Sequence, residues 1–410
     1  MGVSFLFNQV LKRFVREGTL DIVMPDGTTR HYAGQRPGPS ATIHIKTEKA
    51  LRALVVNSGL AFGEGWMDGE IEAVDCSLED VLRVLMLNMQ NTGHIFNRFE
   101  GGVRFLSRRV RQFNGTRRSQ RNVAHHYDLN GTLYDLFLDK DRQYSCAYFQ
   151  RDDMTLEEAQ LAKKRHIAAK LKLDRPGLEV LDIGCGWGGL ALTLAQEFGA
   201  RATGITLSQE QLQVARQRAK EAGLEQQVRF ELLDYRKVKH QFDRIVSVGM
   251  FEHVGIGHYD RFFQNVSRCL KPDGIALLHS IGRMDGPGST NPWINKYIFP
   301  GGYSPALSEV FPAVERSGLW VTDCEVLRLH YAKTIAIWRE RFEANRDKIC
   351  ALYDERFCRM FEFYLVGAEL SFRLQGHMNF QLQLTRAIDA VPLTRDYMFE
   401  AEQAMISRDS

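Results

Sequence analysis

A glycine-rich segment near the middle of the chain, residues 180–189, has the residue types of a loop that binds a nucleotide-like ligand. Gly184, Gly186 and Gly189 satisfy the pattern GxGxxG, which in dinucleotide-binding proteins lets the backbone approach a pyrophosphate at the start of a helix. This pattern is weakly specific on its own, and a purely structural glycine turn also satisfies it. The residues around the loop must therefore decide which ligand it binds.

Asp182 stands two residues before the first glycine, and its charge indicates the ligand. A carboxylate there would repel a pyrophosphate, whereas it would attract the ammonium and sulfonium groups of S-adenosylmethionine. A dinucleotide site also needs an acid at the end of the next strand, about 20 residues on, to bind the ribose hydroxyls. That strand ends at residues 204–208, and the first acid after it is Glu210. We therefore expect S-adenosylmethionine at this loop and not a dinucleotide.

The elements around the loop predict the fold that positions it. From about residue 155 onward, apolar runs of strand length alternate with helical segments, which is the pattern of a parallel sheet covered by helices on both faces. The turn at residues 270–274 resembles the turn before the fifth strand of many methyltransferases. The expected fold class is therefore α/β, a class I S-adenosylmethionine-dependent methyltransferase with a Rossmann-like, doubly wound, mostly parallel sheet. Residues from about 331 to 404 are expected to be mainly helical.

The N-terminal residues differ from this pattern and predict a smaller α+β domain over residues 1–90. Residues 18–34 indicate a β-hairpin around the Asp26-Gly27 turn, and helices are expected to begin near Thr47 and Leu78. A basic segment at 91–123 follows. The catalytic domain is expected over 124–410, with helical additions at its C-terminal end.

Residues 91–123 are strongly basic, because eight arginines are accompanied by a single acid, Glu100. Apolar and aromatic residues lie among them. Such a sequence suits an anionic lipid surface, where each nearby cation contributes about 1 kcal/mol. A nucleic-acid contact and a solvated interdomain connector are the alternatives. The arginines are Arg98, Arg104, Arg108, Arg109, Arg111, Arg117, Arg118 and Arg121.

The overall composition excludes several kinds of protein and site. The net charge of +3 gives no global field for a polyanionic partner. The seven cysteines form no CxxC pair and no zinc spacing, so we expect a reducing cytoplasm and no metal site. Residues 1–15 lack the separate apolar core of a signal peptide. No run of about 18 apolar residues could cross a bilayer, so any membrane contact is expected to be peripheral.

Eight further segments, taken in order, resemble the cyclopropane-fatty-acyl-phospholipid synthase and mycolic acid cyclopropane synthase family. Their joint order is far more specific than any one of them. The similarity covers about residue 120 to the end and extends, less specifically, to residues 65–69. The segments are residues 126–128, 144–149, 206–211, 251–255, 279–282, 296–302, 330–331 and 380–384.

This resemblance implies which residues contact S-adenosylmethionine. For each of these side chains taken alone, ordinary packing or solvation is the alternative to a cofactor contact. The glycines are the safer assignments. The implied contacts are Tyr144 and Ser145 at the methionine end, Asp182, Gly184 and Gly186 in the loop, Thr206, Leu207 and Gln211 at the ribose, and Tyr235 at the adenine.

The catalytic feature of the family is a bound bicarbonate, and the resemblance implies one here. Methyl transfer to an alkene leaves a carbocation, and a proton must then leave the new methyl group so that a three-membered ring can close. A small detachable anion can take that proton, whereas a side-chain carboxylate beside the cation could be alkylated. The implied cradle is Cys146, Glu252, His279, Ile281 and Tyr331, with Cys146 and Ile281 contributing largely through backbone.

The resemblance thus implies methyl transfer to the double bond of an unsaturated acyl chain in a bilayer phospholipid, followed by cyclopropane closure. Loss of another proton, or reduction by a partner protein, would give a methylene- or methyl-branched chain, and the motifs do not separate these outcomes. A small-molecule or nucleic-acid methyltransferase is the alternative from another class; no Asn/Asp-Pro-Pro-Tyr motif supports it, and no nucleic-acid partner is expected. Relatives imply a homodimer. Tyr148, Phe149, Phe251 and Tyr364 are expected to stabilise the cation with their ring faces.

Replacing Arg108, Arg109 and Arg111 with Glu is expected to weaken binding to anionic vesicles and to lower activity on them. The substitutions would invert the charge of the segment that is expected to contact the lipid. Co-sedimentation with vesicles measures the binding. Unchanged vesicle binding by the triple variant would refute this role for the three arginines.

Overall fold

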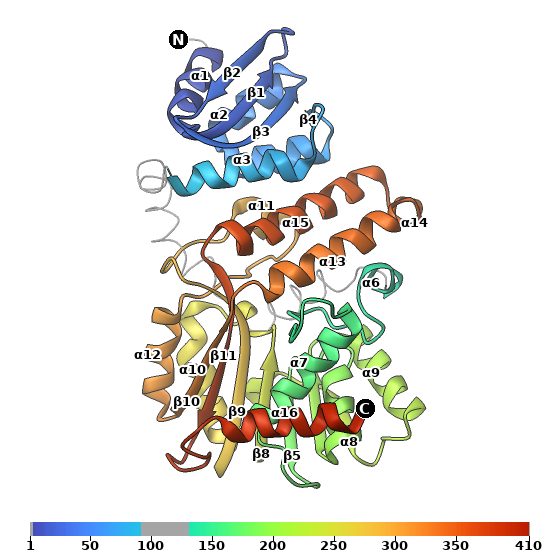
Figure 1. Cartoon of the computed structure of the whole chain (residues 1–410). Coiled ribbons are helices and arrows are strands. Elements are labelled where there is room, and N and C mark those ends of the chain that lie inside the picture. The colour runs from blue at the N-terminus through green and yellow to red at the C-terminus, as the bar shows by residue number, and fades with distance from the viewer. Residues whose placement is uncertain (1–2, 92–130, 410) are drawn as a thin grey trace. The chain divides into compact units, whose positions relative to one another are not determined.

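The computed structural model of the protein describes residues 3–91 and 131–409 (Figure 1). The eight arginines at 98–121 and the motif at 126–128 lie outside these described residues. The described residues form two units, each with its own core. The first contains residues 3–91, 289–300 and 335–376, and the second contains residues 131–288, 301–334 and 377–409.

The first unit is built on a four-stranded sheet in the order β2-β1-β3-β4. Strands β1 (Glu17–Val23) and β2 (Thr29–Ala33) pair antiparallel around Asp26-Gly27, where Gly27 adopts a φ of 81°. Strand β3 (Arg36–Ile45) runs parallel to β1, and β4 (Ile71–Ala73) runs antiparallel to β3. The hairpin expected around Asp26-Gly27 is confirmed.

Helices from three separate parts of the chain complete this unit. Helix α2 begins after Thr47, whose hydroxyl accepts a hydrogen bond from the backbone N–H of Ala50 at 3.1 Å, and α3 begins at Leu78, so both expected starts are confirmed. Leu82 packs in one apolar cluster with Val366 and Leu370, which explains why residues 335–376 belong to this unit although the sequence suggested an addition to the catalytic domain. The helices are α1 (Val3–Phe14), α2 (Glu48–Met67), α3 (Leu78–Asn91), α11 (Pro292–Tyr297), α14 (Arg346–Leu352) and α15 (Glu355–Leu374).

The second unit is built on a seven-stranded sheet in the order β10-β11-β9-β8-β5-β6-β7. The strands from β9 to β7 in that order run parallel, and β11 pairs antiparallel with both β9 and β10. The expected mostly parallel sheet is confirmed. The strands are β5 (Glu179–Ile183), β6 (Arg201–Thr206), β7 (Val228–Leu232), β8 (Phe242–Val248), β9 (Leu270–Arg283), β10 (Trp320–Leu327) and β11 (His377–Thr385).

Helices connect these strands and cover both faces of the sheet. Among the described residues of both units, no helix combines the length and the apolar character needed to cross a bilayer. The helices that lie in this unit or begin in it are α6 (Gly131–Phe137), α7 (Leu156–Lys170), α8 (Gly189–Phe198), α9 (Gln209–Glu221), α10 (Tyr259–Cys269), α12 (Leu307–Ser317), α13 (His330–Ala344) and α16 (Asp396–Asp409), with short 3₁₀ helices η1 (Tyr235–Lys237), η2 (Phe251–His253) and η3 (Ile256–His258).

Alternation along the central strands divides their side chains between the two faces. Leu181 of β5 belongs to the apolar cluster of α10 and α12, whereas Val180 of β5 and Leu277 of β9 belong to the cluster of α7 and α8. Figure 1 shows α10 and α12 on one side of the strands and α7 with α16 on the other. Asp182 and His279 stand two residues after Val180 and Leu277, so both face α7.

Strand β11 lies inside the region that the sequence predicted to be mainly helical, so that prediction is wrong at His377–Thr385. Phe380 and Leu382 enter the cluster of α10 and α12, while Asn379 and Gln381 alternate with them and are fully buried on the other face. This period of two belongs to a strand. The strand is inserted between β9 and β10, and its neighbour β9 lies about a hundred residues earlier in the chain.

Candidate active site

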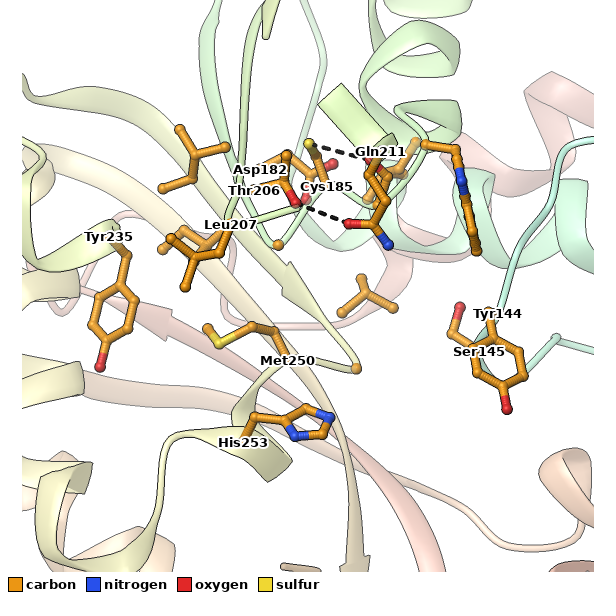
Figure 2. Close-up of a pocket in the computed structure, with 18 of the residues that line it drawn as sticks. Tyr144, Ser145, Asp182, Cys185, Thr206, Leu207, Gln211, Tyr235, Met250 and His253 are labelled. Carbon is orange, nitrogen blue, oxygen red and sulfur yellow. Dashed lines mark hydrogen bonds between the residues drawn. The ribbon is translucent and has the colours of Figure 1, made fainter. Parts of the chain in front are cut away.

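A pocket opens at the carboxyl ends of the parallel strands, which is the edge where doubly wound sheets bind ligands. Figure 2 shows Tyr235 at one end of it and Tyr144 with Ser145 at the other, with Asp182, Thr206 and Gln211 between them. All the residues implied to contact the cofactor line this pocket. They are Tyr144, Ser145, Asp182, Gly184, Gly186, Thr206, Leu207, Gln211 and Tyr235.

The glycine loop crosses from β5 to α8 in a path that side chains would obstruct. Gly184 has a φ of 83°, and a Cβ atom there would lie 2.9 Å from the Cβ of Met250. The backbone N–H groups of Gly184 and Cys185 both donate to the carbonyl of Ile205, at 2.9 and 3.0 Å, which fixes the loop against β6. The loop backbone therefore forms one wall of the pocket.

Asp182 is the group in this wall that most restricts which ligand can bind. Its side chain is buried, and its Oδ2 atom has no hydrogen-bond partner. Burial raises the pKa of this carboxyl to about 7, although Lys163 opposes the rise. A buried carboxyl oxygen without a partner is costly. It suits a ligand that brings a cation or a hydrogen-bond donor, and the ammonium group of S-adenosylmethionine fits that requirement.

The middle of the pocket is held by Thr206 and Gln211. The hydroxyl of Thr206 donates to the side-chain carbonyl of Gln211 at 2.8 Å, and Figure 2 shows the amide nitrogen of Gln211 toward the pocket. Ser208 caps α9 by accepting a hydrogen bond from the backbone N–H of Gln211. The amide nitrogen can thus donate to a hydroxyl-bearing ligand such as a ribose.

Tyr235 closes the far end of the pocket. Its ring packs edge-on against Phe262 of α10, with the ring centroids 5.4 Å apart. Its two neighbours in the sequence are paired: the guanidinium of Arg236 donates a hydrogen bond to the carboxylate of Asp234 at 2.5 Å, which fixes the η1 turn. The exposed part of the ring offers a flat apolar face for a base.

Glu252 lies in η2, directly after β8, and its carboxyl group is buried. Its Oε1 atom accepts a hydrogen bond from the backbone N–H of Ile281 in β9 at 2.6 Å, while Oε2 has no partner. Burial raises the pKa of this carboxyl to about 7, and the bond from Ile281 only partly offsets that effect. Near neutral pH, a large fraction of Glu252 is therefore protonated and able to donate a hydrogen bond.

His279 lies in β9, two residues before Ile281, and is held by strand β11. Its Nδ1 atom lies 3.1 Å from the amide nitrogen of Gln381, and Nε2 lies 3.4 Å from that of Asn379. Burial lowers the pKa of His279 to about 3, so the ring is neutral. A neutral ring has one donor and one acceptor nitrogen, and an amide nitrogen only donates. One of the two amides therefore donates to the ring, and the other accepts from the ring N–H only when its side-chain oxygen takes the place of its nitrogen.

Cys146 and Tyr331 form a second local group. The thiol of Cys146 is buried and donates to the carbonyl of Ala147 at 3.3 Å, and burial raises its pKa, so it is not a thiolate. The backbone N–H of Ala147 donates to Thr334, one turn after Tyr331 in α13. The structure thus joins Glu252 to Ile281, places His279 beside them in β9, and brings the Cys146 segment to the helix of Tyr331.

Two aromatic expectations need correction. Phe251 does not line the pocket; it is fully buried and packs face to face against Tyr259, with ring centroids 4.4 Å apart. The ring of Tyr148 is stacked between the rings of His166 and His330, and the ring centroids are 4.1 and 5.0 Å apart, respectively. Both rings therefore support the elements that carry the site.

The sequence assigned no role to some of the residues that line the pocket: Arg142, Gln143, Lys163, Met250 and His253. His253 is neutral, because burial lowers its pKa to about 4. Of these five residues, Lys163 alone could have been noticed in the sequence. It precedes Ile167, which is buried, by four residues, and this spacing places both on the same side of the helix.

Comparisons with known proteins cover the whole site. Residues 114–382 match the family model described as mycolic acid cyclopropane synthetase, and residues 6–94 match a domain of unknown function. The cyclopropane-fatty-acyl-phospholipid synthase of Escherichia coli (strain K12) is 39% identical over 351 residues, covering 85% of this chain and 89% of that protein. The tuberculostearic acid methyltransferase of Mycobacterium tuberculosis is 35% identical over 383 residues, covering 89% and 87%.

Solved structures give the same result at the level of the fold. A crystal structure of a mycolic acid cyclopropane synthase complexed with SAH and CTAB has a TM-score of 0.61 and 36% identity. It covers 65% of this chain and 97% of that protein. Every pocket residue named above, and all of Cys146, Glu252, His279, Ile281 and Tyr331, fall within the residues that match the family model.

The burial of Glu252 predicts a gain in stability when its charge is removed. Folding raises its pKa from 4.5 to about 7, so the folded protein retains a proton that the unfolded chain releases, and stability falls as pH rises between these values. Glu252→Gln keeps the acceptor for Ile281 but carries no charge. Relative to wild type, its free energy of unfolding should increase by roughly 1–3 kcal/mol between about pH 5 and pH 8.

Urea unfolding at a series of pH values measures this difference. The exposed Glu225→Gln is the matched control for the loss of one negative charge. A stability difference for Glu252→Gln that does not change with pH would contradict a buried, protonated Glu252.

Proposed function

The chain belongs to the mycolic acid cyclopropane synthetase family, and we propose that it is a cyclopropane-fatty-acyl-phospholipid synthase. It is an S-adenosylmethionine-dependent methyltransferase that adds a methyl carbon to the double bond of an unsaturated phospholipid acyl chain and closes a cyclopropane ring. The observation that carries this proposal is the 39% identity with the Escherichia coli synthase over most of both chains.

The pocket supports S-adenosylmethionine as the methyl donor. Tyr235 offers a flat face for the adenine, Gln211 offers a donor for the ribose, and Ser145 lies at the opposite end for the amino-acid portion. The buried Oδ2 atom of Asp182 suits the ammonium group. When bound, S-adenosylmethionine supplies an electrophilic methyl group on a sulfonium.

The reaction requires a dry site in which the reactants are held in contact. An alkene is a weak nucleophile, so alignment and exclusion of water are the main contributions of the protein. After methyl transfer the acyl chain carries a carbocation; a C–H bond of the new methyl group breaks, its electron pair forms the ring-closing C–C bond, and the proton leaves. A protonated Glu252 nearby resists alkylation by that cation better than a carboxylate would.

A bound bicarbonate would supply a small, detachable base for the departing proton. The residues proposed to hold it are Cys146, Glu252, His279, Ile281 and Tyr331. Glu252 fits this role, because its unpartnered Oε2 can donate a hydrogen bond to an anion when the carboxyl is protonated. The N–H of Ile281 already donates to Glu252, so an anion would compete for it, and the ring nitrogens of His279 are occupied by amides of β11.

A second product is supported by one comparison. The similarity to a tuberculostearic acid methyltransferase, over most of both chains, favours a methyl- or methylene-branched product as the alternative. Both outcomes share the first methyl transfer and differ in which proton is lost or whether a reductant takes part. The pocket residues described above serve both outcomes.

Access to the lipid is proposed to occur at a membrane surface. The acyl chains of a phospholipid lie within the bilayer, so we propose that the enzyme acts as a peripheral protein, on the cytoplasmic face. The basic segment at 98–121 is the proposed contact, because its arginines suit anionic headgroups. A homodimer is proposed from the family resemblance alone.

One experiment tests the proposed function. The purified protein is incubated with S-[methyl-¹³C]adenosylmethionine and vesicles of a monounsaturated phospholipid, and the lipid is analysed by chromatography and proton NMR. Labelled cyclopropane resonances are expected. Labelled lipid without them would favour the branched product, and unlabelled lipid would refute both.

Glu252→Gln is expected to lower turnover by about 100-fold or more, since general acid–base groups contribute 10²–10⁴-fold, while the affinity for S-adenosylhomocysteine stays close to that of wild type. The carboxyl group lies outside the residues that line the cofactor pocket. Glu225→Gln, exposed and remote from the site, serves again as control. Full activity in Glu252→Gln would remove Glu252 from the proton-transfer site.

A further inference from the structure

Lys163 is a lysine buried beside the cofactor pocket. It lies in the middle of α7 with 1% of its surface exposed, and its helix is fixed by a capping box between Thr155 and Glu158. Removing an ammonium group from water costs several kcal/mol unless partners replace the lost solvation. A residue held at such a cost needs a stabilising environment, and the identity of its partners indicates what it does.

The two hydrogen-bond partners of Lys163 come from the segment that closes the pocket. Its Nζ atom donates to the side-chain carbonyl of Gln143 at 2.6 Å and to the hydroxyl of Ser145 at 2.9 Å. Both acceptors are neutral. Burial lowers the pKa of Lys163 to about 8, although the nearby Asp139 and Asp141 oppose this effect. The ammonium therefore retains charge that a bound anion could complement.

Lys163 and Asp182 give one region of the pocket two buried groups of opposite sign. Both line the pocket, and Asp182 faces α7, the helix that carries Lys163. Asp182 has an oxygen without a partner, and Lys163 is bonded to Ser145 and Gln143, which line the pocket themselves. A ligand that carries an ammonium and a carboxylate on adjacent atoms matches this arrangement. The amino-acid end of S-adenosylmethionine is such a group.

We propose that Lys163 is a positioning residue for the methyl donor, which holds Ser145 and Gln143 over its amino-acid end and supplies the positive charge that complements its carboxylate. Asp182 complements the ammonium of the same end. This inference rests on the proposed use of S-adenosylmethionine. A zwitterion placed in this way fixes the sulfur that lies between it and the adenosine, and hence the direction of the methyl group.

A merely structural role for Lys163 makes a different prediction. If Lys163 only tethered the 143–145 segment, its loss would affect adenosine ligands with and without an amino-acid end alike. The inference instead requires a selective loss. S-adenosylhomocysteine carries the amino-acid end and 5′-methylthioadenosine lacks it, so the ratio of their dissociation constants separates the two roles.

The test is calorimetric titration of both ligands into wild type and Lys163→Met. The dissociation constant of S-adenosylhomocysteine should rise about 10- to 100-fold, as expected for the loss of a hydrogen-bonded charge, while that of 5′-methylthioadenosine should change by less than about twofold. Arg165→Met is the matched control; it removes a cation from the same helix that is paired with Glu197. This control should keep the wild-type ratio.

Two further variants keep the test informative if Lys163→Met folds poorly. Lys163→Gln retains a donor without the charge, and Ser145→Ala removes one partner of the ammonium; both should shift the ratio in the same direction, by less. An unchanged ratio in all three variants, or equal losses for both ligands, would overturn the inference alone. Wild type that binds neither ligand would overturn the proposed function and the inference with it.

Discussion

The free-energy cost of burying two carboxyl groups at the carboxyl ends of the parallel strands is the constraint on which the site depends. Asp182 lies in β5 and Glu252 follows the neighbouring strand β8, and each has one buried oxygen without a hydrogen-bond partner. Burial raises the pKa of both to about 7. The consequences differ, because Asp182 lines the cofactor pocket and can meet a cation, whereas Glu252 is held by Ile281 and can donate to an anion.

The face of the sheet under α7 supplies the polar support for these acids. The sheet-facing stripe of this helix carries Lys163, His166 and Lys170, at spacings of three and four residues. Lys163 holds the segment that closes the pocket, and Lys170 pairs with Asp323 of β10 at 3.3 Å. The opposite face of the sheet is apolar and packs against α10 and α12. The face under α7 thus combines these polar groups with an apolar cluster, whereas the face under α10 and α12 is mainly apolar.

The sequence predicted the parts of the fold and site that depend on local pattern. The alternation of apolar strands and helices specifies the parallel sheet, and the glycine pattern with Asp182 specifies the loop. The sequence placed strand β11 in a mainly helical region, and this prediction is wrong because the position of the strand beside β9 depends on a partner about a hundred residues away. Lys163 carries no motif, and its role becomes visible only when the fold brings α7 to Ser145. Phe251 belongs to a family motif yet is a core residue.

The central claim is that burial keeps Glu252 protonated up to neutral pH, so that it can donate a hydrogen bond at the site of proton removal. The most direct measurement is a pH titration of the protein labelled with ¹³C at the glutamate carboxyl carbons, followed by NMR, with the Glu252→Gln variant identifying the resonance. A midpoint near 7 is predicted. A midpoint near 4.5, the ordinary value for a glutamate, would contradict the account.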